Sequence, residues 1–342
     1  MRTELGDALR AIPSPEVAHD SRVAAALTAS EHYLASNAAL RSLEADAYWP
    51  KWDSPWWHMV LLHELGEVRR IPERAIRMVV ARLNALPLKI FPLHPEDSPP
   101  GTDPYRDSQC HCALGCMYQV SAEFGLDAER ELPWVKPWFV RYQMADGGLN
   151  CDSTAYLQHD ECASSMVGTV AVFEAMLLGP ESWTPSQVAF LERAADFLIA
   201  REVMLGSSSN HNSEERAAQA AWRLPCFPRF YFYDVVRGAS ALVHWAERSG
   251  RSLPVRAIAG VVEYMASAFP DGVVALGRRA YAGSNTIVQT AAGAWIRGQP
   301  ASTFPLLEST SVVGAPCPFV TRQWSTTRRA ILRLIETGQL VE

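Results

Sequence analysis

The pattern of hydrophobic and polar positions divides most of the chain into helical segments of two kinds. Segments of the first kind are almost uncharged and apolar on every side, which is typical of helices buried all round. Segments of the second kind are amphipathic, with arginines on one side and aliphatic residues on the other. The uncharged helices are predicted at 57–65, 110–125, 163–178, 230–245 and 285–296, and the amphipathic ones at 72–86, 129–143, 185–202, 254–269 and 319–336.

The two kinds of helix alternate along the chain, and the uncharged ones recur at intervals of roughly 50 to 75 residues. Such helical hairpins can bury both members if they close into a ring with the uncharged helices inside. The pattern therefore predicts an all-α fold, an α/α toroid of about five to six hairpins. An open solenoid is the alternative, but it would expose one side of every uncharged helix. Residues 51–342 form the predicted toroid domain, and helices within residues 1–50 pack on it.

The stretch from Gln143 to Leu178 carries the densest set of candidate functional side chains. The paired glycines after Asp146 predict a turn, because glycine adopts backbone conformations that other residues avoid. Asp160 and Cys162 then stand at the start of an uncharged helix, where unpaired N–H groups favour a carboxylate or thiolate. They are candidate metal ligands, or else a helix cap and a small buried residue.

Three further residues lie near the predicted starts of uncharged helices. His111 is a candidate metal ligand or general acid/base, because its ordinary pKa is close to neutral. His58 is a weaker candidate, since a lone histidine is commonly a satisfied core residue. Asp234 should face the same cavity as Asp160, or else cap its own helix. If it is buried it needs a partner, which could be a cation, Arg237 or a substrate amine.

The cysteines do not form a standard metal motif. Cys110, Cys112 and Cys116 are spaced C-x-C-x3-C without a second pair, and the interpretation favoured for them is packing. The count of seven cysteines is odd and suits reduced thiols in a cytoplasmic protein. His63-Glu64 is not followed by a second histidine at position 67, which excludes the H-E-x-x-H metalloprotease motif.

Composition and charge exclude several classes of protein. The chain has 342 residues and a formal net charge of -6, so no basic surface for nucleic acid is expected. No run approaches the roughly 18 apolar residues of a membrane span, and the first residues lack a signal-peptide pattern, which predicts a cytoplasmic protein. No G-x-G-x-x-G or P-loop motif occurs, so no nucleotide cofactor is predicted.

The motif Q-x-x-D-G-G at 143–148 resembles the repeat motif of the terpenoid cyclase and protein prenyltransferase superfamily, which includes the prenyltransferase β-subunits and squalene-hopene cyclase. Asp160-x-Cys162 is similar to the pair with which β-subunits bind catalytic zinc. At the place of the family's third ligand, a histidine, this chain has Asp234. The resemblance thus implies a toroid with zinc on Asp160, Cys162 and Asp234. The D-x-D-D motif of class II cyclases is absent.

These observations predict an enzyme that acts on a small, partly apolar molecule in a central cavity, by zinc-assisted transfer, elimination or cyclisation. The alternatives are a metal-free acid/base cyclase or lyase, and a non-catalytic binding or scaffold subunit of a heteromer. A homo- or hetero-oligomer is possible for the enzyme as well. The polar run at 206–215 is a candidate mobile loop or lid. The expected catalytic residues are His111, Asp160, Asp234 and His58, and the expected substrate-binding residues are Trp57, Tyr233, Arg237, Tyr281 and Asn285.

Overall fold

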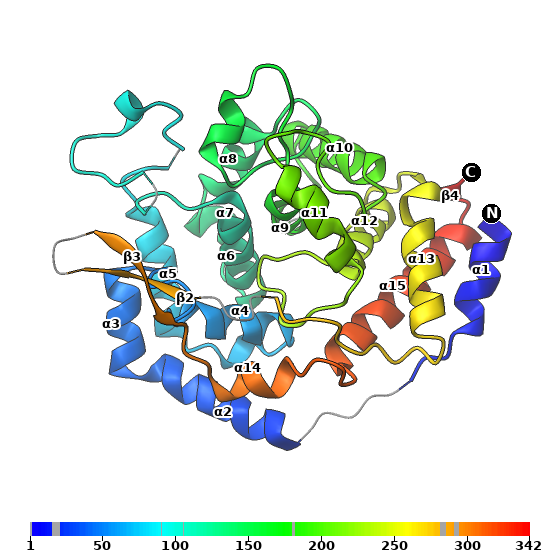
Figure 1. Ribbon diagram of the computed structural model, residues 1–342, viewed down its shortest axis with the longest axis horizontal. Coiled ribbons are helices and arrows are strands. Elements are labelled where there is room, and N and C mark those ends of the chain that lie inside the picture. Colours follow the sequence, from blue (N-terminus) through cyan, green and yellow to red (C-terminus); the bar gives the residue numbers. More distant parts are fainter. Residues whose placement is uncertain are drawn as a thin grey trace.

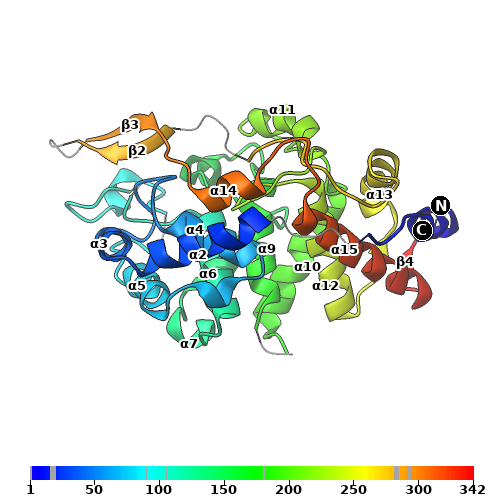
Figure 2. The ribbon, with the colours of Figure 1, turned by 90° about the horizontal axis from the view of Figure 1, so that it is seen from below.

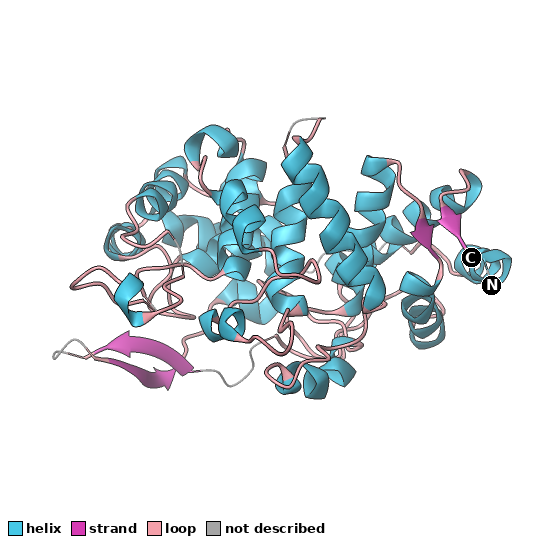
Figure 3. Cartoon of the chain, turned by 90° about the horizontal axis from the view of Figure 1, so that it is seen from above, coloured by secondary structure: helices cyan, strands magenta, loops and turns pink. Residues whose placement is uncertain are grey.

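The structure is a computed structural model that describes residues 2–15, 21–89, 91–104, 106–179, 182–280, 285–290 and 294–342. Within these residues the chain forms fifteen α-helices and only four short strands, which confirms the all-α class (Figure 3). No helix among them is long and apolar enough to cross a membrane.

The α-helices are α1 (Arg2–Ala11), α2 (Ser21–Ala35), α3 (Asn37–Ala45), α4 (Trp56–Glu64), α5 (Glu73–Asn84), α6 (His111–Phe124), α7 (Ala128–Glu131), α8 (Val135–Tyr142), α9 (Met166–Leu177), α10 (Pro185–Ala200), α11 (Ser213–Trp222), α12 (Val235–Ser249), α13 (Arg256–Ala268), α14 (Pro305–Thr310) and α15 (Pro318–Glu336). Three 3-10 turns are η1 (Val68–Arg70), η2 (Pro95–Asp97) and η3 (Ser153–Leu157). The strands are β1 (Leu253–Pro254), β2 (Asn285–Gln289), β3 (Trp295–Pro300) and β4 (Leu340–Val341).

Four of the predicted uncharged helices form the centre of the molecule. α4, α6, α9 and α12 pack in that order, each against the next, and α15 packs against α12 (Figure 1). The contact between α6 and α9 is especially close because Gly115 lies against the backbone of α9. A Cβ at Gly115 would stand 2.7 Å from the carbonyl oxygen of Ala171, so only glycine fits there. The uncharged sequence of these helices is thus explained by neighbours on several sides.

The predicted amphipathic helices lie outside this central group. α10 packs against α8, α9, α12 and α13, and α5 packs against α3 (Figure 2). The apolar side of α5 is buried through Ile76, Val79 and Leu83. α15 packs against α12, and its Arg328 is only 3% exposed, although the arginines of the amphipathic helices were predicted to lie on the polar side. Its guanidinium donates hydrogen bonds to the carbonyl oxygens of Ile12 and Pro13.

The predicted helix at 285–296 is wrong. Within its described part, the chain forms β2, which pairs antiparallel with β3 (Figure 3). Thr286, Ile287 and Val288 are β-branched, and such residues favour a strand over a helix. The hairpin also contacts the rest of the chain, because Ile287 bridges to Lys51 and the Thr286 hydroxyl donates to the Lys51 carbonyl.

The two ends of the chain meet at the side of the molecule opposite to this hairpin (Figure 1). α1, which the hydrophobic pattern did not predict, packs against α13 and α15. β1 and β4 pair in parallel, and the backbone N–H of Arg2 donates to the carboxylate of Glu342 at 3.1 Å. The first helix is therefore attached to the C-terminal helices α13 and α15.

Candidate functional site

Three cysteine side chains converge at the start of α6. Cys110 is the N-cap residue of α6, Cys112 lies in its first turn, and Cys151 comes from the loop that follows the Gly147-Gly148 turn. Their sulfur atoms lie within 4.8 Å of one another, and those of Cys110 and Cys112 are 3.4 Å apart. Among the described residues, this is the one group of at least three histidine, cysteine or acidic side chains that could hold a metal ion.

His111 holds the loop of Cys151 against α6. Its Nδ1 lies 2.8 Å from the carbonyl oxygen of Asn150, and the backbone N–H of Cys112 donates to the Cys151 sulfur at 3.3 Å. The His111 ring is completely buried, and burial lowers its pKa to about 4. The metal-capable cluster does not include His111, and its acid/base role stays a prediction. Its contact with Asn150 positions the loop that carries Cys151.

The three sulfur atoms lie at the wall of a pocket of about 610 Å³, which we call the cysteine pocket. Its volume falls within the range of small-molecule sites. The other lining residues include aromatic side chains and polar or charged groups, among them Tyr48, Trp49, Phe91, Tyr231, Lys51, Asp103, Ser108, Gln109 and Asp152. The pocket therefore offers a partly apolar surface next to a group of soft ligands.

The surroundings of the thiols favour a thiolate at one of them. Hydrogen bonds from the Cys112 and Cys151 thiols, together with the charge of Lys51, hold the pKa of Cys110 well below its usual value. The same bonding raises the pKa of Cys112 and of Cys151. The Lys51 ammonium lies 5.8 Å from the centre of the Tyr231 ring, at the edge of the pocket. Of the three thiols, Cys110 is therefore the one whose surroundings favour the thiolate form.

Asp160 and Cys162 do not stand at the start of a helix. α9 begins at Met166 with Ser165 as its N-cap, and the carboxylate at this helix end is that of Glu215, which accepts the N–H of Met166 at 2.6 Å. Asp160 is exposed, and the Cys162 sulfur lies 3.8 Å from the hydroxyl of Ser164. The prediction failed because α9 begins several residues later than expected, at Met166.

The predicted turn at Asp146-Gly147-Gly148 is confirmed. Gly147 has φ +93°, and a Cβ there would stand 2.0 Å from the carbonyl oxygen of Arg193. Gln143 donates through Nε2 to the carbonyls of Gly147 and Phe190, each at 2.8 Å. In this chain the Q-x-x-D-G-G motif therefore fixes the connection between α8 and the loop that carries Cys151.

The polar run at 206–215 is packed onto the protein. Ser207 and Ser209 are 0% and 4% exposed. Backbone N–H groups of residues 210 and 211 donate to the carboxylate of Glu161, at 2.6 and 2.8 Å. The end of the run already belongs to α11, which begins at Ser213. The serines of the predicted mobile loop or lid therefore bond within the protein.

Asp234 is the N-cap of α12 and is completely buried. Its carboxylate accepts hydrogen bonds from the backbone N–H of Arg237 at 2.9 Å and from Nε of Arg229 at 2.7 Å. Arg229 holds the pKa of Asp234 below its usual value against the effect of burial. The cap alternative is thus the one observed, and the charge partner is Arg229, since the Arg237 side chain pairs with Glu174. Asp160, Cys162 and Asp234 do not form a metal-capable group.

The other predicted site residues are dispersed over the molecule. Trp57 is 1% exposed and packs against Trp52, with ring centres 4.3 Å apart. The Tyr233 hydroxyl donates to the carbonyl of Val203 at 2.6 Å. Asn285 is exposed in β2, and Tyr281 lies outside the described residues. The structure therefore does not bring the described members of the predicted set to one cavity mouth.

His58 lies in a separate small pocket of about 300 Å³. Its Nδ1 is 3.1 Å from the Ser30 hydroxyl, and its ring stacks on Phe304 with centres 3.7 Å apart. Burial lowers the pKa of His58 to about 3. It matches the expectation of a satisfied core histidine and not that of a catalytic base.

Comparison with known proteins does not identify the chain. No family model, no curated protein and no solved structure matches it. Assignment to the terpenoid cyclase and prenyltransferase superfamily therefore stays a prediction.

Sequence reasoning missed Cys151 and Lys51. For Cys110 and Cys112 the sequence favoured packing over metal binding, because no second cysteine pair follows them. A signal was present, since Cys151 comes three residues after the glycine turn that begins the stretch singled out as central. The contact between Cys151 and α6 depends on the fold and leaves no local spacing pattern.

Proposed function

We propose that the chain is an enzyme that binds a zinc ion on Cys110, Cys112 and Cys151 and acts on a small, partly apolar molecule in the cysteine pocket. The single observation that carries the proposal is the convergence of three sulfur atoms within 4.8 Å at the wall of this pocket. Cysteine sulfur is a preferred zinc ligand, and three protein ligands leave a fourth tetrahedral position open, as is typical of catalytic zinc.

The residues around the thiols fit this role. Lys51 offsets the negative charge that three thiolates would concentrate, and its charge already favours the thiolate of Cys110. Tyr48, Phe91 and Tyr231 provide an apolar wall for the body of a substrate. Ser108 and Gln109 can orient its polar groups. A bound zinc would supply activation of a thiol or water, or polarisation of a leaving group, which covers transfer, elimination and cyclisation.

We also infer that the helices form the α/α toroid expected from the sequence. The order of packing through α4, α6, α9, α12 and α15 supports a closed ring, since all five helices line a common pocket. The resemblance to the prenyltransferase and cyclase superfamily would then hold at the level of fold. The metal ligands would differ from the implied Asp160, Cys162 and Asp234, although they too lie near the start of an inner helix.

The proposal is tested by metal analysis of protein purified without chelators and under reducing conditions. We expect about one zinc per chain, lost in each of the Cys110→Ser, Cys112→Ser and Cys151→Ser variants. Cobalt substitution gives a second readout, because sulfur-to-cobalt charge-transfer absorption appears only when thiolates bind the metal.

Three control variants sharpen the test. Cys116→Ser lies one turn further along α6, outside the cluster, and should keep the metal. Asp160→Ala and Cys162→Ala should also keep it, whereas the ligand set implied by the family resemblance requires that both lose it. Absence of any metal from the native chain after incubation with zinc would refute the proposal and favour a metal-free or non-catalytic protein.

A further inference from the structure

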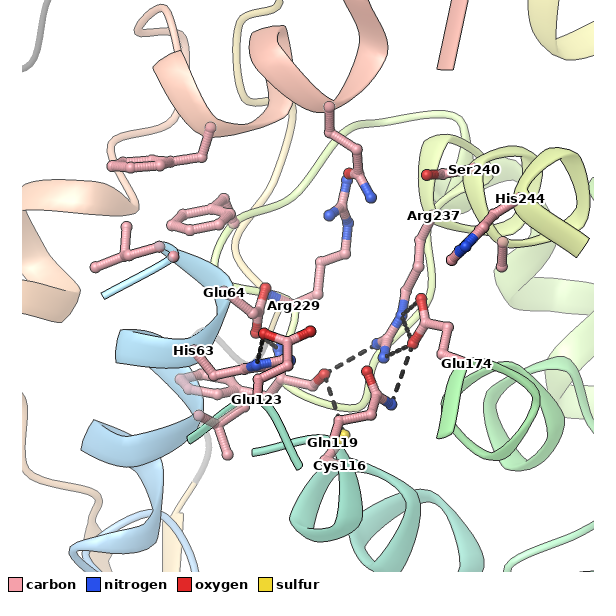
Figure 4. A pocket seen from close by; sticks show the side chains of 18 of the residues that line it. His63, Glu64, Cys116, Gln119, Glu123, Glu174, Arg229, Arg237, Ser240 and His244 are labelled. Atoms are coloured by element: carbon pink, nitrogen blue, oxygen red, sulfur yellow. Dashed lines mark hydrogen bonds and ion pairs between the residues drawn. The ribbon is translucent and has the colours of Figure 1, made fainter. Parts of the chain in front are cut away.

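A second pocket of about 460 Å³ lies between α4, α6, α9, α12 and α15, and we call it the charged pocket (Figure 4). Three glutamates and three arginines line it, each set drawn from several elements. They are Glu64, Glu123, Glu174, Arg229, Arg237 and Arg322. Acceptors and donors of opposite charge thus balance around one cavity.

One wall of the charged pocket is a guanidinium held tightly by a carboxylate. Arg237 on α12 meets Glu174 on α9 through two contacts, Nε to Oε1 at 3.0 Å and Nη2 to Oε2 at 2.6 Å (Figure 4). Gln119 on α6 donates to the same carboxylate at 3.4 Å. The three side chains come from three different helices, and the hydrogen bonds between them hold the Arg237 guanidinium and the Glu174 carboxylate in place.

Across the pocket, Glu64 and Arg229 are fixed in the same manner. The Glu64 carboxylate accepts the backbone N–H groups of Arg229 and Phe230, the first at 2.8 Å. The Arg229 side chain is bound to the buried Asp234 through Nε. Arg229 is 5% exposed, and its Nη2 has no hydrogen-bond partner among the residues that the structure describes. A buried nitrogen at the wall of a cavity without a partner calls for an acceptor from a ligand.

An aromatic surface adjoins these charged groups. The rings of Phe227 and Phe319, both in the pocket wall, stack with centres 4.9 Å apart and an angle of 14°. Phe227 is 2% exposed, so the half-buried ring of Phe319 is the one that can contact C–H groups of a ligand. The charged pocket therefore combines fixed donors, fixed acceptors and a flat apolar surface.

We propose that the charged pocket binds a neutral, hydroxyl-rich small molecule of the sugar or polyol class. A hydroxyl both donates and accepts, so it satisfies an arginine and a glutamate that lie near each other. The three glutamates would repel an anion, and the three arginines would repel a cation. An apolar molecule would desolvate all six charged groups without offering them hydrogen bonds, which is unfavourable. The stacked phenyl rings suit the C–H face of a sugar ring.

This site is distinct from the cysteine pocket. The segment that follows Phe227 separates the two, because Phe230 lines the charged pocket whereas Tyr231 lines the cysteine pocket. Phe230 has φ +56°, and its carbonyl oxygen accepts Nη1 of Arg237 at 2.9 Å. Ligand binding in the charged pocket therefore does not depend on the proposed metal centre.

The test is a binding titration of the full chain with glucose, maltose and myo-inositol, followed by calorimetry and by saturation-transfer NMR. Cyclohexanol and glucuronate are the matched apolar and anionic probes. We expect at least one of glucose, maltose and myo-inositol, the neutral polyhydroxyl probes, to bind, while cyclohexanol and glucuronate do not. The same titration of the Cys110→Ser variant should give the same Kd, which separates this site from the metal proposal.

Three variants locate the bound molecule. Arg322→Ala, Glu123→Gln and Arg229→Lys should each weaken binding by about tenfold, the size expected for loss of a hydrogen bond to a charged group. Arg322 and Glu123 are exposed at the pocket, so these two variants decide the matter even if Arg229→Lys does not fold. Arg329→Ala, on the outer side of α15, is the matched control and should bind as the native chain does.

Two results would overturn the proposal. The first is binding of glucuronate alone, or of none of the neutral probes, which would assign the pocket to another ligand class or to none. The second is unchanged binding of a neutral probe in all folded pocket variants, which would place that probe elsewhere on the molecule.

Discussion

The cysteine pocket and the charged pocket differ in how strongly their polar groups are tied to the fold. In the charged pocket, the carboxylates and guanidinium groups bond to one another and to backbone atoms of several helices. In the cysteine pocket, the thiols contact mainly one another, and the Cys110 side chain makes no capping hydrogen bond to α6. Side chains that are already bonded within the fold can recognise a ligand without moving. Thiols with few other contacts can instead lose their protons and bind a metal as thiolates. The two pockets therefore suit recognition and chemistry, respectively.

The largest effect is expected where the charged pocket is part of the core. Arg229→Met leaves the carboxylate of Asp234 completely buried and without its charge partner. The free energy of unfolding should fall by about 3–5 kcal/mol, the usual cost of breaking a buried ion pair from one side. Urea titration monitored by circular dichroism measures it, with Arg329→Met as the exposed control.

The double variant Arg229→Met with Asp234→Asn identifies the cause. Asparagine is neutral and is still a good N-cap for α12, so it should recover much of the lost stability. If the single variant costs less than about 1 kcal/mol, the charged pocket is not tied to the fold in the way described.

A pH effect of intermediate size on stability is expected from His58, near the first turn of α4. Glu64 at its last turn belongs to the charged pocket, whereas His58 near its first turn is kept neutral by burial, which lowers its pKa to about 3. The unfolded chain binds a proton at His58 near its ordinary pKa, while the folded chain does not. The stability due to His58 is thus present above about pH 6.5 and is lost as the pH falls toward 3.

Between pH 7 and pH 4 this loss should amount to about 2–3 kcal/mol, less than the full shift implies because the ring is partly exposed. His58→Phe keeps the stacking on Phe304 and removes the titration, so its stability should vary less with pH. The measurement is made with a chelator present, so that metal release does not contribute, and exposed His32→Phe is the control. An equal pH dependence in the native chain and His58→Phe would exclude His58 as the source.

The smallest effect on stability is expected in the cysteine pocket. In metal-free protein, Cys110→Ser should change the free energy of unfolding by less than about 1 kcal/mol, because serine is a preferred N-cap residue. Cys116→Ser should cost about 1–2 kcal/mol, because it places a hydroxyl in the core, where the thiol behaves as a small hydrophobe. Thermal unfolding of both variants with a chelator present measures the difference.

The two cysteine variants should thus separate metal binding from stability, since Cys110→Ser loses the metal and Cys116→Ser keeps it. A Cys110→Ser variant as unstable as Arg229→Met would show that the thiols are structural. The distinction between the two pockets would then no longer stand.

The sequence predicted the helices better than the site. The uncharged segments correctly predicted α4, α6, α9 and α12, and the amphipathic segments correctly predicted α5, α10 and α13 outside them. These predictions succeeded because the burial of a helix determines which positions along its own sequence are apolar. The aromatic run from Phe230 to Asp234 was predicted to be helical, but it forms a loop between the two pockets. Its apolar side chains are buried as expected, although their periodicity did not reveal the backbone that buries them.

The candidate site could be predicted only in part. Cys110 and Cys112 were correctly placed near the start of a helix but were interpreted as packing residues, whereas the glycine turn before Cys151 was correctly predicted. The choice of Asp160 and Cys162 rested on a helix start that lies several residues further along, at Met166. Neither the cap supplied by Glu215 nor the pairing of Arg229 with Asp234 could be read from spacing.

The sequence by itself determined the helical class and the division into central and outer helices, since both follow from the 3.6-residue period of apolar positions. The tertiary structure alone decided that Cys151 meets the thiols of α6 and that three arginines and three glutamates share a pocket. The physical reason is that helix formation and burial depend on the residues of one segment. Contacts between distant side chains depend on the paths of the loops that join them, and these paths leave no period in the sequence.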